Sequence, residues 1–195
     1  MTLNELRDEV FLITGRPDRE AETLSAIRSA TLMAHQKDFF YRDLRESGVD
    51  LQEEKYVHSW DYRAMIPRWR AFKYFRKSDV SGADGCPIEL LSVEMALDAY
   101  GAEKQDAAYV AGDNLQINSS TTLRYARIGW YENPDVTQAG YTSWIADSHP
   151  FLLIHLAASQ VFRSIGRQEE AVSYRQLAQE ELSNLIISNV QGVGY

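Results

Sequence analysis

The segment Ala108–Pro134 carries the clearest strand signal in this sequence and constrains the fold more than any other segment. Its apolar residues recur mostly at every second position on both sides of a polar tract, Asn118–Thr122. Alternation with a period of two is typical of a half-buried strand, and a polar tract between two such runs predicts a turn. We therefore predict an antiparallel β-hairpin over residues 108–131, with an earlier turn at Gly112–Asn114 and a breaker at Asn133–Pro134.

A hairpin of this kind needs support from other parts of the protein. A lone two-stranded ribbon is only marginally stable in water, so it must pack on the helices or on a neighbouring subunit. Large aromatic side chains on the two strands provide contact area for both. We expect four of them to divide between the helix bundle and an intersubunit contact: Tyr109, Tyr125, Trp130 and Tyr131.

Helical periodicity dominates on either side of the predicted hairpin. Apolar residues at three- and four-residue spacing, followed by Gly or Pro, predict helices. Their expected ranges are 3–14, 19–46, 67–77, 88–100, 148–165 and 168–187. A chain of 195 residues can bury one sizeable core, so we predict a single domain over residues 1–195. The predicted fold class is mainly α, a bundle of N- and C-terminal helices with an inserted antiparallel β-hairpin and an extended C-terminal tail.

The predicted tail, residues 188–195, is small and mildly apolar, a composition that suits contact with a partner better than packing on its own domain. We expect it to be mobile in the free subunit and ordered by a partner. The candidate interface residues in and beside it are Ile187, Asn189, Val190, Val193 and Tyr195.

Charge and cysteine content exclude several classes of protein. The formal net charge of -8 argues against a protein that grips DNA phosphates, since that binding depends on Lys and Arg. The single cysteine, Cys86, excludes an intrachain disulfide and gives no metal framework. No apolar run approaches the ~20 residues of a membrane span, and the N-terminus has no signal-peptide character. We expect a soluble protein made in a reducing cytoplasm.

Motifs that carry catalytic chemistry are missing from the sequence. No zinc-protease, phosphate-loop, nucleophile-elbow or dinucleotide-binding pattern occurs. His149 and His155 are too far apart around a helix to act together, and His35 and His58 have no carboxylate or cysteine at a fixed spacing. We therefore predict no enzymatic activity, no catalytic residues, no cofactor and no metal. A hydrolase whose site combines Asp, Glu and His from distant segments is the third-ranked interpretation.

The segment 67–77 is both basic and aromatic. Its cations interleave with aromatic residues, as on a surface that binds single-stranded nucleic acid. The simpler interpretation is a helix whose apolar side is core and whose cations are solvated or paired, and the acidic total favours it. The alternative is a small cytoplasmic nucleic-acid-binding or regulatory protein. The residues concerned are Arg68, Arg70, Lys73, Arg76 and Lys77, with Trp69, Phe72, Tyr74 and Phe75.

Taken in order, five stretches resemble the head-to-tail adaptor (connector, or neck) proteins of tailed bacteriophages over nearly the whole chain. They are AETLSAIRSATLMAHQKDFF, IPRWRAFKYFRK, YVAGDNLQI, LRYARIGWYENPD and WIADSHP. The resemblance implies a structural virion protein, made in the host cytoplasm, that forms a ring in the neck, usually a dodecamer, beneath the portal.

The same resemblance implies the partners of such a ring. They are the portal protein, tail or nozzle proteins, further copies of the chain, and genomic DNA that passes through the lumen without specific binding during ejection. No membrane is involved. It also implies a helix bundle with a projecting hairpin and a terminal extension that reaches the portal or a neighbouring subunit. An acidic lumen would keep DNA from adhering to the wall.

Overall fold

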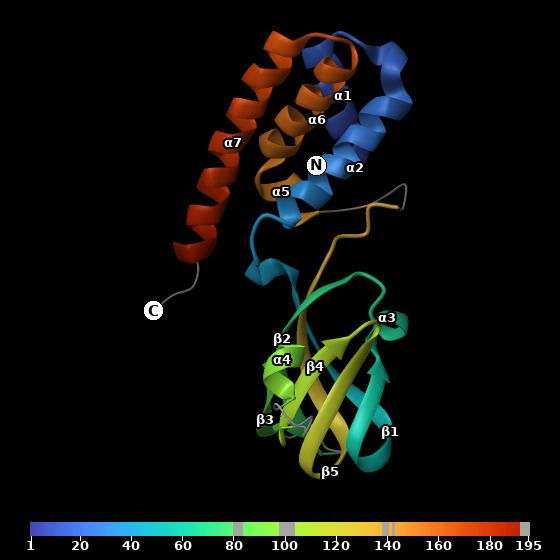
Figure 1. The fold of residues 1–195 in the computed structure, drawn as a ribbon. Helices are drawn as coiled ribbons and strands as arrows, with labels where there is room; N and C mark the ends of the chain where they lie inside the picture. The colour runs from blue at the N-terminus through green and yellow to red at the C-terminus, as the bar shows by residue number, and fades with distance from the viewer. Residues whose placement is uncertain (80–83, 98–103, 138–140, 142, 192–195) are drawn as a thin grey trace. The chain divides into compact units, whose positions relative to one another are not determined.

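The computed structural model describes residues 1–79, 84–97, 104–137, 141 and 143–191. The chain divides into two compact units where the sequence predicted one domain. The helical unit comprises Met1–Asp43 and Asn133–Tyr195, and the β unit comprises Leu44–Glu132 (Figure 1). About 48% of the described residues are helical and 34% are in strands, so the predicted mainly α fold class is wrong.

The helices of the helical unit begin and end at capping residues that the sequence supplies. Thr2 and Glu5 form a capping box at the first helix, and Gly15 ends it in the left-handed conformation at φ 64°. Pro150 occupies the first turn of α6, where its missing N–H costs nothing. The helices are α1 (Leu3–Thr14), α2 (Glu20–His35), α5 (Trp144–Ser148), α6 (Pro150–Ser164) and α7 (Gln168–Gln191).

One apolar core joins the two ends of the sequence in the helical unit. Leu6 and Ile27 from the N-terminal helices are fully buried together with Leu153 and Val161 of α6. Helix α6 packs against α1, α2 and α7 and is the central element of this core. The N- and C-terminal helices therefore do form a bundle, but this bundle is one unit of the protein and not the whole fold.

The β unit is built around one long strand, β5. Its N-terminal part, Asn114–Asn118, pairs with β4, and its C-terminal part, Tyr125–Glu132, pairs with β2. Strand β3 bridges β2 and β4, so these four strands close into a small barrel, while β1 pairs along the other edge of β5. The strands are β1 (Leu44–Asp61), β2 (Trp69–Ser78), β3 (Asp84–Leu91), β4 (Ala107–Ala111) and β5 (Asn114–Glu132), with short helices α3 (Tyr62–Met65) and α4 (Val93–Ala96).

Three predicted helices are therefore corrected. The helix expected over 19–46 ends at His35, because its apolar stripe stops there and the chain from Leu44 pairs with β5. The helix expected over 67–77 is strand β2, whose aromatic-rich sequence suits a sheet once β5 is available as a partner. The helix expected over 88–100 is the end of β3 followed by α4 as far as Ala96, and residues 98–100 lie outside the described residues.

A hairpin is present, but the chain reverses at the earlier predicted turn, Gly112–Asn114, and the turn expected at Asn118–Thr122 is wrong. Strands β4 and β5 are joined at Gly112–Asp113, and the polar tract Asn118–Thr122 continues within β5. The Asp106 carboxylate accepts two hydrogen bonds from this tract, one from the backbone N–H of Ser120 at 2.9 Å and one from the Ser120 hydroxyl at 2.7 Å. The Lys77 ammonium and these two donors lower the pKa of Asp106 to about 2. Side chains distant in sequence thus allow a polar tract to remain in a strand.

Gly129 lets an aromatic ring lie across the central strand. A Cβ at this position would meet the Cε1 of Tyr74 at 2.4 Å, because Tyr74 pairs with Gly129 across β2 and β5. Gly48 of β1 is the useful contrast, since a Cβ there would meet nothing within 4 Å.

We expect Gly129→Ala to lower the free energy of unfolding by about 1–3 kcal/mol, because the Tyr74 ring must move out of its packed position. Gly48→Ala, the matched control, should leave stability unchanged or raise it slightly. Urea denaturation of both variants measures the difference. Equal effects of the two substitutions would show that the Tyr74 contact does not constrain the sheet.

Candidate functional site

A buried polar network lies at the end of α2. The Nδ1 of His35 is 2.8 Å from the Oδ2 of Asp43, and its Nε2 is 2.8 Å from the Oγ of Ser143. The indole N–H of Trp144 donates to the Oδ1 of Asp43 at 2.7 Å. His35, Asp43 and Ser143 are each no more than 5% exposed. We call His35, Asp43, Ser143 and Trp144 the His35 network.

Local structure brings the network residues together. His35 is the last residue of α2, and Asp43 ends a 3₁₀ turn that begins at Tyr41. Ser143 is the N-cap of α5, and its Oγ accepts the backbone N–H of Ile145 at 3.2 Å. The network therefore joins the end of α2, the residue before β1, and the start of α5.

Ser143, His35 and Asp43 contact one another in the same order as the serine, histidine and aspartate of a hydrolytic triad. A nucleophile must reach its substrate, yet Ser143 is 4% exposed and its Oγ already caps a helix. The geometry therefore fits a structural brace. Sequence reasoning did not find it, because Ser143 lies 108 residues from His35 and no local pattern links them.

A cavity of about 630 Å³ lies beside the His35 network. The guanidinium of Arg42 lies over the Trp144 ring at 5.3 Å and donates to the Oγ of Ser148 at 2.9 Å. A fixed cation next to an aromatic wall can hold an apolar side chain together with a carboxylate. The cavity is lined by Tyr41, Arg42, Trp144, Ser148, His149, Leu185, Ser188 and Asn189.

The end of α7 forms one wall of this cavity and contains part of the predicted tail. Asn189 lines the cavity and donates to the Oδ2 of Asp38 at 3.1 Å, and Ile187 is 55% exposed. Val190 also belongs to α7, whereas Val193 and Tyr195 lie outside the described residues. The tail expected over 188–195 is thus helical as far as Gln191, because the apolar stripe of α7 continues through Leu185 to its last turns.

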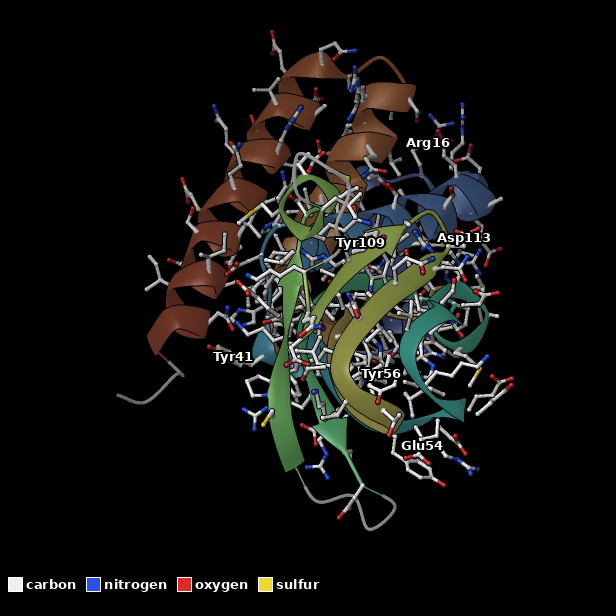
Figure 2. All side chains as sticks on the ribbon, turned by 60° about the horizontal axis from the view of Figure 1, so that its bottom comes forward. Arg16, Tyr41, Glu54, Tyr56, Tyr109 and Asp113 are labelled. Carbon is white, nitrogen blue, oxygen red and sulfur yellow. The ribbon has the colours of Figure 1, made fainter. Side chains whose placement is uncertain are left out.

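The predicted hairpin aromatics belong to the β unit. Tyr131 is 4% exposed, and the half-buried Trp130 packs against the apolar core of the barrel. Tyr109 and Tyr125 are half-buried, and the Arg124 guanidinium lies 5.2 Å from the Tyr125 ring centre. Trp130 therefore serves a core that the sequence did not predict. More exposed rings occur at Tyr56 of this unit and at Tyr41 of the helical unit (Figure 2).

The basic and aromatic segment is engaged within the β unit. Arg68 donates to Glu132 at 2.7 Å, and Lys77 pairs with Asp106. The rings of Trp69 and Phe72 pack on Tyr62, with centres 4.7 and 5.2 Å away. Nucleic-acid binding by stacking needs accessible rings beside unpaired cations. The rings of Trp69 and Phe72 are half-buried, although Lys73 is exposed and makes no ion pair with a described residue. The geometry thus gives little support to the nucleic-acid alternative.

The described residues offer neither a metal site nor a membrane span. They contain no group of three or more His, Cys, Asp or Glu side chains that could hold a metal ion. Within the same residues, no helix is both long and apolar enough to span a bilayer. Cys86 is exposed on β3.

We expect His35→Leu to lower the free energy of unfolding by about 3–5 kcal/mol, because it leaves the buried Asp43 carboxylate without its imidazole partner. Ser143→Ala should cost only about 0.5–2 kcal/mol, the range for loss of an N-cap. Denaturant unfolding measures both. A fluorophosphonate, which labels reactive serines, should leave Ser143 unmodified, and labelling there would contradict the interpretation as a brace.

Comparisons with known proteins add no assignment to this geometry. No known protein family matches the chain, and no characterised protein is significantly similar to it.

Proposed function

We propose that this chain is a structural virion protein, a head-to-tail adaptor whose copies form a ring between a portal protein and the tail. The sequence resemblance suggests the role, and the surface of the protein supports it. The ring would leave a channel for DNA, and copies would meet each other, the portal and the next tail component. Each of these contacts needs a surface that the isolated chain leaves open to solvent.

The observation that carries the proposal is the exposure of large apolar side chains on both units. Exposed apolar side chains mark contact sites where they share one surface, as Met33 and Val172 do along the same groove. In the helical unit, the exposed side chains are Leu12, Met33, Phe39, Tyr41, Phe151, Val172, Leu177 and Ile187. In the β unit, they are Tyr56, Val57, Met65, Val93 and Met95. A subunit that is covered on several sides by neighbours accounts for this distribution.

Charge supports a channel through which DNA passes without sticking. The net charge is -8, and two cations of the basic segment, Arg68 and Lys77, are paired with carboxylates. A surface with few available cations repels the DNA backbone within a Debye length of about 8 Å at physiological salt.

The end of α7 is the best candidate for the portal contact. Ile187 is exposed in the last turns of this helix, and Ser188 and Asn189, which follow it in the sequence, line the cavity together with Arg42. An apolar side chain next to a pocket with a fixed cation resembles the core and rim of a protein interface. We therefore place the portal contact at Ile187 and this cavity.

We expect Ile187→Asp to weaken binding of the portal protein encoded in the same genome by about tenfold or more, because it puts a carboxylate into an apolar contact. Leu177→Asp is the control, since Leu177 is 43% exposed on the same helix but precedes Ile187 by ten residues and so lies away from the end of α7. Both variants should unfold at the wild-type temperature. Biolayer interferometry on immobilised portal rings measures the affinities.

Two outcomes of this experiment would contradict the proposal. If wild-type chain does not bind the portal at all, the adaptor proposal fails. If both variants bind as the wild type does, the portal contact does not involve the end of α7.

A further inference from the structure

The outer face of α1 carries an exposed leucine among carboxylates. Leu12 is 79% exposed, the largest exposed fraction of any large apolar side chain among the described residues. Glu5, Asp8 and Glu9 precede it at positions that share its side of the helix. Arg7 pairs with Asp8 at 2.8 Å and with Glu20, so Glu9 is the carboxylate next to Leu12 without an ion pair. We call Glu5, Asp8, Glu9 and Leu12 the acidic ridge.

A groove of about 560 Å³ lies between α2, α6 and α7 and has the opposite character. Met33 is 41% exposed and Val172 is 56% exposed along it. Arg163 and Arg175 also line it, and neither guanidinium makes an ion pair with a described residue. We call this site the basic groove.

The ridge and the groove lie on different helices of one unit. Helix α1 packs on α2 and α6, whereas the groove opens between α2 and α7 over α6. Figure 1 shows α6 flanked by α2 and α7, with α1 behind it. Because the complementary surfaces are separate on each copy, their contact is head-to-tail, and a head-to-tail contact forms a closed ring when its rotation allows.

We propose that the acidic ridge of one copy docks into the basic groove of the next. Leu12 is then covered by Met33 and Val172, while Glu9 meets the guanidinium groups of Arg163 and Arg175. Apolar burial at the centre with charge pairing at the rim is the arrangement of specific protein interfaces. The proposal rests on the proposed ring-forming function and identifies the surfaces that would join its subunits.

Cysteine cross-linking tests the contact on the full chain. In a Cys86→Ser background, a Leu12→Cys chain is mixed with a Val172→Cys chain and oxidised with copper phenanthroline, and the double variant Leu12→Cys with Val172→Cys is oxidised alone. We expect a covalent dimer from the mixture and a ladder of higher oligomers from the double variant, because a disulfide needs Cα atoms within about 7 Å. The control pair, Leu12→Cys with Leu177→Cys, lies outside the groove and should cross-link at background level.

Charge reversal separates specific docking from random collision. Arg163→Glu with Arg175→Glu should slow cross-linking by about tenfold, and Asp8→Arg with Glu9→Arg on the Leu12→Cys chain should restore it. If charge reversal on the ridge alone, or on the groove alone, leaves the cross-linking rate unchanged, the proposed contact is wrong.

Native mass spectrometry with and without the portal distinguishes the two proposals. If rings form but Leu12→Cys and Val172→Cys do not cross-link, the proposed interface is wrong and the proposal of a ring still stands. A chain that stays monomeric on the portal and gives no cross-link would contradict both.

Discussion

The His35 network provides buried polar contacts across the interruption in the sequence of the helical unit, because His35 contacts Ser143 and Asp43 accepts a hydrogen bond from Trp144. The chain leaves this unit after Asp43 and returns at Asn133, so α1 and α2 meet α6 and α7 only through long-range packing. His35 ties the end of α2 to the last residue before β1 and, through Ser143, to the start of α5. The same residues position Trp144, which forms a wall of the cavity proposed for the portal contact.

The inserted β unit also joins segments that are distant in the sequence, but it does so through strand pairing. Strand β5 contributes to both halves of the barrel, so a single strand fixes the positions of β1, β2 and β4. This arrangement gives the insertion a core of its own, centred on Ile117, Phe75 and Ile128. Each unit can then present apolar side chains to solvent without exposing its core, as a subunit with several neighbours requires.

The parts of the fold that could be read from the sequence depend on local signals. The capping box at Thr2, the glycine at position 15 and the proline at position 150 are local, and α1 and α6 follow from them. Strand β2 was misread as a helix because its aromatic residues fit either period, and pairing with β5 decides between them. The His35 network could not be predicted, since its imidazole and serine lie 108 residues apart. A charged ridge and a charged groove likewise become complementary surfaces only when α2, α6 and α7 are assembled.

The central claim is that copies of this chain assemble as a ring on a portal. Cryo-electron microscopy of the portal protein encoded in the same genome, incubated with an excess of the chain, tests it most directly. The account predicts a closed ring on one face of the portal, with the helical units of adjacent copies in contact and the ends of α7 against the portal. Portal rings that stay bare, or that carry isolated copies without contacts between them, would contradict it.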